Sequence, residues 1–383
     1  MPARHCSRLI RTGDPENSPT VTRGIMTAGS DTTKHSKGRI MEYRCLGRTG
    51  LHVSPICMGT MNFGSPVDEA GCMRLVSHAL DHGLNFFDTA NAYEGYARTF
   101  GSPGGVGERL LSKALGRRRD EAVILTKLGN PIGQGPLHAG LSNHHLSREL
   151  DQSLLRLGTD HVDVLLCHRA DPTVAIEDLW CTLDRFVREG KVRAVGISNW
   201  PSWRMAQACE HAARHGLVRC AVSSPQYSLL NRDIELEHVP ACDHYEVGLV
   251  TYKGLMGGVL TGKYRRGQKD LNGTRAGDGS YWLPPLDAAL FDRVEAYERI
   301  VERAGCSMTE YSIAWLLSRP MMASLILGFR NIGQVDAAIA AARTTVPTED
   351  ASEIDRIFNP PIRPGGEQVM RWRGSWVLDD QEL

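Results

Sequence analysis

Eight short apolar runs recur between residues 56 and 329, and this repeat constrains the fold more than any other feature of the chain. The segments between the runs carry apolar residues three and four positions apart, as in Leu179, Leu183 and Phe186, which is typical of amphipathic helices. Apolar strands that alternate with helices indicate a parallel sheet whose outer face is covered. The runs are ICMGT (56–60), LNFFDT (84–89), AVILTK (122–127), VDVLLCH (162–168), RAVGISN (193–199), RCAVSSPQ (219–226), VGLVTY (247–252) and SLILGF (324–329).

Eight such units predict an α/β fold of the (β/α)8 TIM-barrel type, and they fit it better than an open doubly wound sheet. No G-x-G-x-x-G follows the first run, which further weakens a dinucleotide-binding fold of the doubly wound kind. Before the first run, YRCLGRTGLHVSP predicts an N-terminal β-hairpin. Residues 253–323 predict a long loop with two helices between the seventh and eighth barrel strands. Loops of this length usually belong to the active face of a barrel.

The two ends of the chain differ from the barrel, which we assign to residues 41–358. Residues 1–40 lack apolar periodicity and carry seven basic and three acidic residues. They also lack the apolar stretch of a secretory signal, so we expect a disordered extension or a start codon placed upstream of Met41. The acidic residues count against a mitochondrial presequence without excluding it. Residues 359–383 are expected to form a C-terminal tail, for which a position over the active site is one option.

Composition narrows the possible partners. The chain has 44 basic and 44 acidic residues, so its charge offers no case for nucleic-acid binding. No apolar run approaches the ~20 residues that span a membrane. The ten cysteines are scattered without a C-x-x-C pair, which argues against a structural zinc site and favours a reducing compartment. We therefore expect a cytoplasmic protein that acts on a small molecule.

Polar residues stand at the ends of seven of the predicted strands. The C-terminal ends of barrel strands meet on one face, so these side chains are expected to converge there. The seven residues are Asp88, Lys127, His168, Asn199, Gln226, Tyr252 and Arg330. Asp88 follows two phenylalanines and would be desolvated without a cation, and Lys127 can supply one. Tyr93 comes five residues after Asp88 and completes a candidate group.

Asp88, Tyr93, Lys127 and His168 suit the transfer of a hydride and a proton to a carbonyl group. Tyr93 would donate the proton, and we expect the Lys127 ammonium to lower the phenol pKa from about 10. Asp88 would hold Lys127 charged, and His168 would hydrogen-bond the carbonyl oxygen. The simpler alternatives are a strand-end lysine that reaches solvent and a structural histidine. A metal-dependent hydrolase or isomerase is disfavoured, and no metal is expected, because this face supplies one histidine and one carboxylate.

Several motifs resemble the aldo-keto reductase superfamily over residues 41 to about 345. FFDTANAY contains the family's Asp and Tyr, LTKLG its Lys and LLCHRADP its His. GKVRAVGISNW is similar to the family segment that leads to a Ser-Asn pair, and GLMGGVLTGKY resembles the loop after the seventh strand. The resemblance implies a (β/α)8 reductase with NADPH/NADP+ as cofactor. It also implies that Asp88, Tyr93, Lys127 and His168 are the catalytic residues.

The resemblance further implies a set of cofactor contacts. Ser198 and Asn199 would hold the nicotinamide carboxamide, Tyr252 would stack on its ring, and Arg330 would meet the ribose 2′-phosphate. The full set is Gly59, Thr60, Met61, Ser198, Asn199, Gln226, Tyr252, Lys253, Leu255, Gly258, Gly328, Arg330 and Gln334. A guanidinium at position 330 suits a phosphate, which favours NADPH over NADH.

Three positions depart from the family pattern. Lys253 stands where the family commonly has Ser, and it could reach the pyrophosphate. Ser224 stands where many members place a nicotinamide-binding glutamine, so Gln226 would serve instead. Ala338 replaces a frequent adenine-contacting Asn or Glu.

The sequence as a whole predicts NADPH-dependent reduction of an aldehyde or ketone to an alcohol, with Tyr93 as general acid. The alternative is a regulatory protein that binds the cofactor with negligible turnover, similar to the potassium-channel β subunits of this superfamily. The chemistry of the strand ends does not specify the carbonyl substrate.

Overall fold

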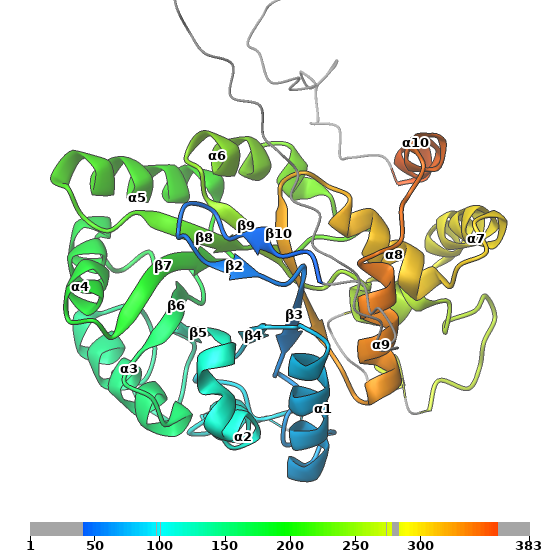
Figure 1. The fold of residues 1–383 in the computed structure, drawn as a ribbon. Coiled ribbons are helices and arrows are strands. Elements are labelled where there is room, and N and C mark those ends of the chain that lie inside the picture. The colour runs from blue at the N-terminus through cyan, green and yellow to red at the C-terminus, as the bar shows by residue number, and fades with distance from the viewer. Residues whose placement is uncertain (1–40, 97, 100, 273, 278–282, 359–383) are drawn as a thin grey trace, which may run out of the picture. The chain divides into compact units, whose positions relative to one another are not determined.

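The structure is a computed structural model that describes residues 41–358 except 97, 100, 273 and 278–282. Eight parallel strands close into a barrel, in which each strand pairs with the next along the chain and the last pairs with the first (Figure 1). The predicted TIM barrel is therefore confirmed. Its strands are β3 (Ile56–Gly59), β4 (Phe86–Asp88), β5 (Val123–Leu128), β6 (Val162–Cys167), β7 (Val192–Ser198), β8 (Cys220–Ser224), β9 (Gly248–Thr251) and β10 (Met322–Gly328).

Helices surround this barrel, and each predicted strand lies within two residues of its observed bounds (Figure 1). Side chains cap several helix starts: Asp68 accepts a hydrogen bond from Gly71 N, and Ser142 accepts one from His145 N. The α-helices are α1 (Glu69–Asp81), α2 (Val106–Leu115), α3 (Asn143–Leu157), α4 (Ile176–Arg188), α5 (Ser202–His215), α6 (His238–His244), α7 (Ala288–Arg303), α8 (Met308–Leu317), α9 (Ile332–Ala341) and α10 (Thr348–Ile357). Three 3-10 helices are η1 (Gly116–Glu121), η2 (Asp233–Glu235) and η3 (Met256–Thr261).

The strands are mainly apolar because both of their faces are buried. One face packs inside the barrel, where Cys57, Phe86, Leu125 and other inward side chains form an inner core. The other face packs against the surrounding helices in a larger outer core. Asp88, Lys127 and His168 are buried where this apolar packing ends, at the C-terminal ends of their strands.

The predicted N-terminal hairpin is confirmed as β1 (Arg44–Cys45) and β2 (His52–Val53), which pair antiparallel. Leu46 and Val53 belong to the inner core and are fully buried, so the hairpin fills one end of the barrel (Figure 1). Gly47 has a φ of +52°, and a Cβ there would lie 2.8 Å from main-chain atoms of β8 and β9. Only a glycine allows this close approach of the two backbones.

The long connection between β9 and β10 contains η3, α7 and α8, so the prediction of two helices in residues 253–323 is also confirmed. The predicted extension at residues 1–40 and the predicted tail at residues 359–383 lie outside the described residues. None of the helices in the described ranges has the length and apolar character to cross a membrane.

Candidate active site

Three of the predicted catalytic residues occupy the ends of adjacent strands. Asp88 is the last residue of β4, Lys127 is the penultimate residue of β5, and His168 directly follows β6. Leu125 belongs to the inner core, and side chains alternate along a strand, so Lys127 points to the same inner side two residues further on. The fold therefore directs Lys127 toward the axis at the C-terminal mouth of the barrel.

The Lys127 ammonium makes three hydrogen bonds, which use all its protons. It donates to a carboxylate oxygen of Asp88, to the carbonyl oxygen of Thr89 at 3.2 Å and to the hydroxyl of Tyr93 at 3.1 Å. Asp88 and Lys127 are only 2% and 3% exposed. Burial of two charges costs several kcal/mol per ion, and close pairing with full hydrogen bonding offsets much of that cost. Burial alone would lower the pKa of Lys127, but the charge of Asp88 and the hydrogen bonds to Asp88 and Tyr93 raise it overall, so the amine is an ammonium.

His168 lies beside this group. Its ring meets the Tyr93 ring edge to face, with 5.8 Å between centroids and an interplanar angle of 78°. Burial, together with the nearby charges of Lys127, Arg169 and Arg98, holds the pKa of His168 well below its usual range. The imidazole is therefore neutral, and its buried Nδ1 has no hydrogen-bond partner among the residues that the structure describes. The structure thus brings together all four residues that the sequence predicts.

The prediction that the pKa of Tyr93 is lowered is wrong. Burial raises the pKa of Tyr93 to about 12, although the Lys127 ammonium opposes this shift and the Asp88 carboxylate adds to it. The sequence argument counted the ammonium but neither the loss of solvent nor the carboxylate that neutralises the ammonium. A phenol with this pKa is fully protonated at neutral pH, so it is ready to donate.

A second buried ion pair supports the strand that carries Lys127. Glu108 of α2 is fully buried, and its carboxylate accepts hydrogen bonds from Thr126 at 2.7 Å and from Arg156 at 2.6 Å. Thr126 precedes Lys127 on β5, so this pair connects α2 and α3 to the strand. Sequence reasoning did not assign Glu108 to the site; the available signal was a Gly-Glu pair at a predicted helix start.

The predicted nicotinamide residues also converge next to His168. Asn199 directly follows β7 and has a φ of +57°, a conformation that is uncommon for non-glycine residues but that asparagine adopts more readily than most. Its amide donates to the carbonyl oxygen of His168 and to Ser198 Oγ, both at 3.1 Å. Tyr252 donates its hydroxyl proton to Asn199 Oδ1 at 2.5 Å. The ends of β6, β7 and β9 are therefore joined by side chains at this point.

Gln226 and Lys253 lie on the next part of the mouth. Gln226 pairs with Tyr252 in an isolated β-bridge, and its side-chain oxygen accepts a hydrogen bond from Lys253 Nζ at 3.2 Å. Burial, and then the charge of Arg275, lowers the pKa of Lys253. The Lys253 ammonium and the Arg275 guanidinium, both in the connection that follows β9, are therefore close enough to interact.

Several buried polar atoms around the mouth have no partner within the described ranges of the chain. Thr60 Oγ1, Asn62 Oδ1 and Ser224 Oγ belong to residues that are at most 1% exposed, and none of these atoms makes a hydrogen bond to a described residue. Such atoms are rare in folded proteins because they cost free energy. A ligand with amide and hydroxyl groups could satisfy them, so the residues present fit a nicotinamide nucleoside.

The remaining predicted cofactor residues occupy the same face of the barrel. Gly59 and Gly328 are register partners at the ends of β3 and β10. Thr60 and Met61 follow β3, Leu255 and Gly258 lie in or beside η3, and Gly258 has a φ of +99°. Beyond β10, the Gln334 side chain accepts a hydrogen bond from Arg330 N at 2.7 Å, which organises the start of α9.

Two further residues lie near Arg330 and were not assigned to the cofactor from the sequence: Tyr96, which contacts Arg330, and Arg275, which contacts Tyr96. The guanidinium carbons of Arg330 and Arg275 lie 5.7 and 5.0 Å from the centroid of the Tyr96 ring, and Arg275 also donates to the Tyr96 hydroxyl at 2.7 Å. Tyr96 belongs to the glycine-rich loop after Tyr93. Loops have no periodicity that predicts their contacts.

Comparison with known proteins agrees with the fold. The sequence profile of the Aldo/keto reductase family matches residues 55–359. The chain is 34% identical to the uncharacterised oxidoreductase YrpG of Bacillus subtilis, with 85% of this chain and 98% of that protein aligned. It is 33% identical to a probable voltage-gated potassium channel subunit beta of Oryza sativa (83% and 95% aligned) and 30% identical to L-glyceraldehyde 3-phosphate reductase of Escherichia coli (82% and 92%). On this match, and with the eight-stranded barrel, the chain belongs to the aldo/keto reductase family of oxidoreductases.

Proposed function

We propose that this chain reduces an aldehyde or ketone to the corresponding alcohol with NADPH. The observation that carries the proposal is the 3.1 Å hydrogen bond between the Lys127 ammonium and the Tyr93 hydroxyl, made while the same ammonium is paired with Asp88. A phenol, an ammonium and a neutral imidazole at the mouth of a barrel form the proton-donating half of a carbonyl reduction. NADPH, when bound, supplies the hydride.

Each side chain has a distinct part in this proposal. Tyr93 donates its proton to the carbonyl oxygen as negative charge develops there. Although its pKa is about 12, the transfer is favourable because a forming alkoxide is a stronger base than a phenolate. Lys127 stabilises the phenolate that remains, and Asp88 keeps Lys127 charged and in position. Neutral His168 hydrogen-bonds the carbonyl oxygen and orients it toward Tyr93.

The residues predicted to hold the cofactor form one continuous set around the mouth. Ser198, Asn199, Gln226 and Tyr252 would bind the nicotinamide end, with Gly59, Thr60 and Met61 beside its ribose. Lys253, Leu255 and Gly258 would follow the pyrophosphate, and Gly328, Arg330 and Gln334 would hold the adenosine end. The unpaired buried atoms of Thr60, Asn62 and Ser224 support this assignment.

Charge favours NADPH over NADH. Lys253, Arg275 and Arg330 bring three cations to the outer part of the mouth, and a guanidinium suits a 2′-phosphate in charge and geometry. Arg275 is an addition to the set that the sequence predicts. We infer that it shares the phosphate charge with Lys253.

We also propose residues 41–358 as the catalytic unit and the cytoplasm as its compartment. The nine described cysteines are free thiols, which supports a reducing environment. The name L-glyceraldehyde 3-phosphate reductase, borne by a relative, supports a small aldehyde as substrate.

A second function is favoured by the relative named as a probable potassium channel subunit beta. In that case the chain would bind NADPH and turn over negligibly. NADPH oxidation measured with a panel of small aldehydes and ketones separates the two functions. Multiple turnovers on any member support the reductase. NADPH binding without turnover across the panel, in a single-turnover as well as a steady-state assay, would contradict it and favour the regulatory function.

A further inference from the structure

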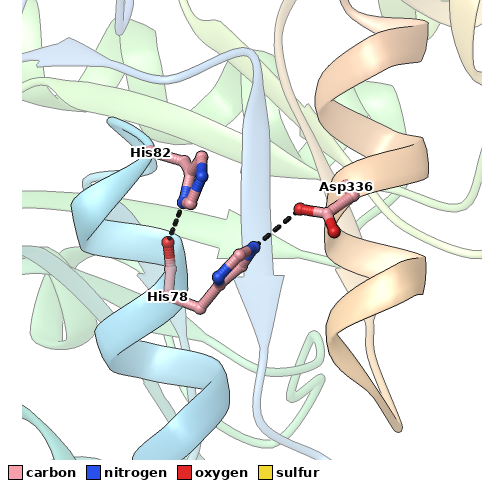
Figure 2. A group of neighbouring side chains, drawn as sticks. All are labelled: His78, His82 and Asp336. Atoms are coloured by element: carbon pink, nitrogen blue, oxygen red, sulfur yellow. Dashed lines mark hydrogen bonds and ion pairs between the residues drawn. The ribbon is translucent and has the colours of Figure 1, made fainter.

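Two histidines and an aspartate meet on the outer helical layer, away from the mouth of the barrel. His78 lies in the last turn of α1, His82 directly follows this helix, and Asp336 lies on α9, which packs beside α1 (Figure 2). The two imidazole centroids are 4.1 Å apart, and His78 Nε2 is 2.6 Å from Asp336 Oδ1. One ligand atom from each residue lies within 4.8 Å of the other two. Imidazole and carboxylate are both common transition-metal ligands.

The hydrogen bonding prepares His82 for a metal ion. His82 Nδ1 is 2.8 Å from the carbonyl oxygen of His78, and a carbonyl can only accept, so Nδ1 carries the proton. The lone pair of His82 is therefore on Nε2, the atom not engaged with the backbone (Figure 2). Metal-binding histidines generally have this arrangement, in which the second nitrogen donates to a carbonyl or carboxylate. The helix itself thus sets the tautomer that a metal ion requires.

His78 and Asp336 supply the other two ligands. Their side chains are 21% and 53% exposed, so an ion can reach them from solvent without opening the core. An ion bound between them would replace the hydrogen bond from His78 Nε2 to the carboxylate, and the displaced proton would leave to solvent. A rotation of the side chains would bring each of the three ligand atoms to ~2.0–2.2 Å from the ion, which is the distance that zinc requires.

We propose that His78, His82 and Asp336 form a site for a divalent transition-metal ion of the Zn²⁺ class, with water in the remaining position. The site would fasten α9 to α1. Asp336 and Gln334 share α9, so the ion would hold the helix whose start carries the candidate adenosine-binding residues. The site does not depend on the proposed reductase activity, because no catalytic side chain takes part in it.

The experiment is a calorimetric titration of the metal-stripped full-length chain with Zn²⁺, repeated with Ni²⁺. The exposed pair of Cys45 Sγ and His52 Nε2, which are 3.4 Å apart, could bind the same ions, so all variants carry Cys45→Ser. His82→Ala and Asp336→Asn each remove one ligand. The matched control is His215→Ala on α5, where His211 and His215 repeat the i, i+4 spacing with centroids 4.5 Å apart. Among the described residues, that second pair has no third ligand beside it.

We expect one ion per chain in the Cys45→Ser background and about a tenfold or greater rise in Kd with either His82→Ala or Asp336→Asn. His215→Ala should leave the Kd of the ion at His78, His82 and Asp336 unchanged. Ligand-dependent stabilisation gives a second readout: the ion should raise Tm in the background and control proteins but much less in the two ligand variants. The Tm of each variant without metal confirms that it is folded.

Three outcomes would overturn the proposal. The first is unchanged affinity in Asp336→Asn, which would reduce the site to an ordinary histidine pair. The second is unchanged affinity in His82→Ala. The third is the absence of binding, or of a rise in Tm, at millimolar metal.

Discussion

The Lys127 ammonium and the Tyr93 hydroxyl lie 3.1 Å apart, although their residues are separated by 34 positions in the sequence. The barrel brings them together because β4 and β5 are neighbours and both end at the same mouth. Asp88 accepts a hydrogen bond from the same ammonium, so the charge on each of the three groups affects the other two. Each prediction about chemistry at this site follows from that arrangement.

Replacement of Tyr93 by Phe should remove the proton donor and little else. We expect kcat for carbonyl reduction to fall by about 10²–10⁴, because the side chain can no longer supply the proton. The ring and its edge-to-face contact with His168 remain, so the packing around position 93 should be kept. NADPH affinity, measured by fluorescence titration, should stay within about twofold of the wild-type value, since a phenyl ring preserves the pocket shape. Activity close to wild type in Tyr93→Phe would exclude Tyr93 as the general acid.

The Asp88–Lys127 pair should contribute to stability in a way that a surface pair does not. Asp88→Asn leaves a buried ammonium without its counter-charge, so we expect the free energy of unfolding to fall by about 3–5 kcal/mol in urea denaturation. Asp88→Asn/Lys127→Met removes both charges and should be more stable than Asp88→Asn alone, but it should remain inactive.

The control for this experiment is Glu69→Gln, which breaks the exposed Lys113–Glu69 pair. This substitution should lower the free energy of unfolding by less than about 1 kcal/mol. A double variant no more stable than Asp88→Asn would show that the cost does not come from an uncompensated buried charge.

Arg330→Ala should distinguish the two nicotinamide cofactors. Loss of the guanidinium should raise KM for NADPH about tenfold or more while leaving KM for NADH within about twofold, because NADH lacks the 2′-phosphate. Arg299→Ala, at an exposed position of α7, is the control for a general loss of positive charge. An equal rise in KM for both cofactors would place Arg330 elsewhere than at the 2′-phosphate.

Stability should fall in mild acid because of His238. This histidine is 5% exposed and lies between Ser223 Oγ at 2.8 Å and Ser202 Oγ at 3.3 Å, and burial lowers its pKa from 6.5 to about 4. Between these two values the unfolded chain binds more protons than the folded one. The contribution of His238 is therefore complete above pH 6.5 and decreases toward pH 4.

At about pH 5 this loss should amount to about 2 kcal/mol. His238→Gln should show a smaller difference in unfolding free energy between about pH 5 and neutral pH than the wild type does. His144→Gln, at an exposed position of α3, should keep the full difference. Equal pH dependence in His238→Gln and wild type would rule out His238 as the source.

The barrel and the four central residues could be predicted because their signals are local. Each strand is a short apolar run, and each candidate side chain stands at the end of one, so the rule that strand ends converge was enough to group Asp88, Lys127 and His168. The pKa of Tyr93 could not be predicted in the same way. Its direction depends on how completely the residue is desolvated, and burial in three dimensions outweighs the one cation that the sequence revealed.

Contacts between loops or outer helices were also beyond the sequence. Tyr96 and Arg275 come from loops, whose paths follow no period. His78 and Asp336 are 258 positions apart on two helices that meet only because the barrel closes. The sequence argument sought metal ligands at the strand ends, where it found one histidine. The two histidines at the C-terminal end of α1 have the spacing of one helical turn, but their carboxylate partner comes from a distant element.

The N-terminal hairpin closes the end of the barrel opposite the Asp88–Lys127 pair. Leu46 and Val53 are fully buried there, and a methyl group on Gly47 would collide with the backbone of β8 and β9. We therefore expect small molecules and protons to approach the pair from the side where the strands end, beside Tyr93.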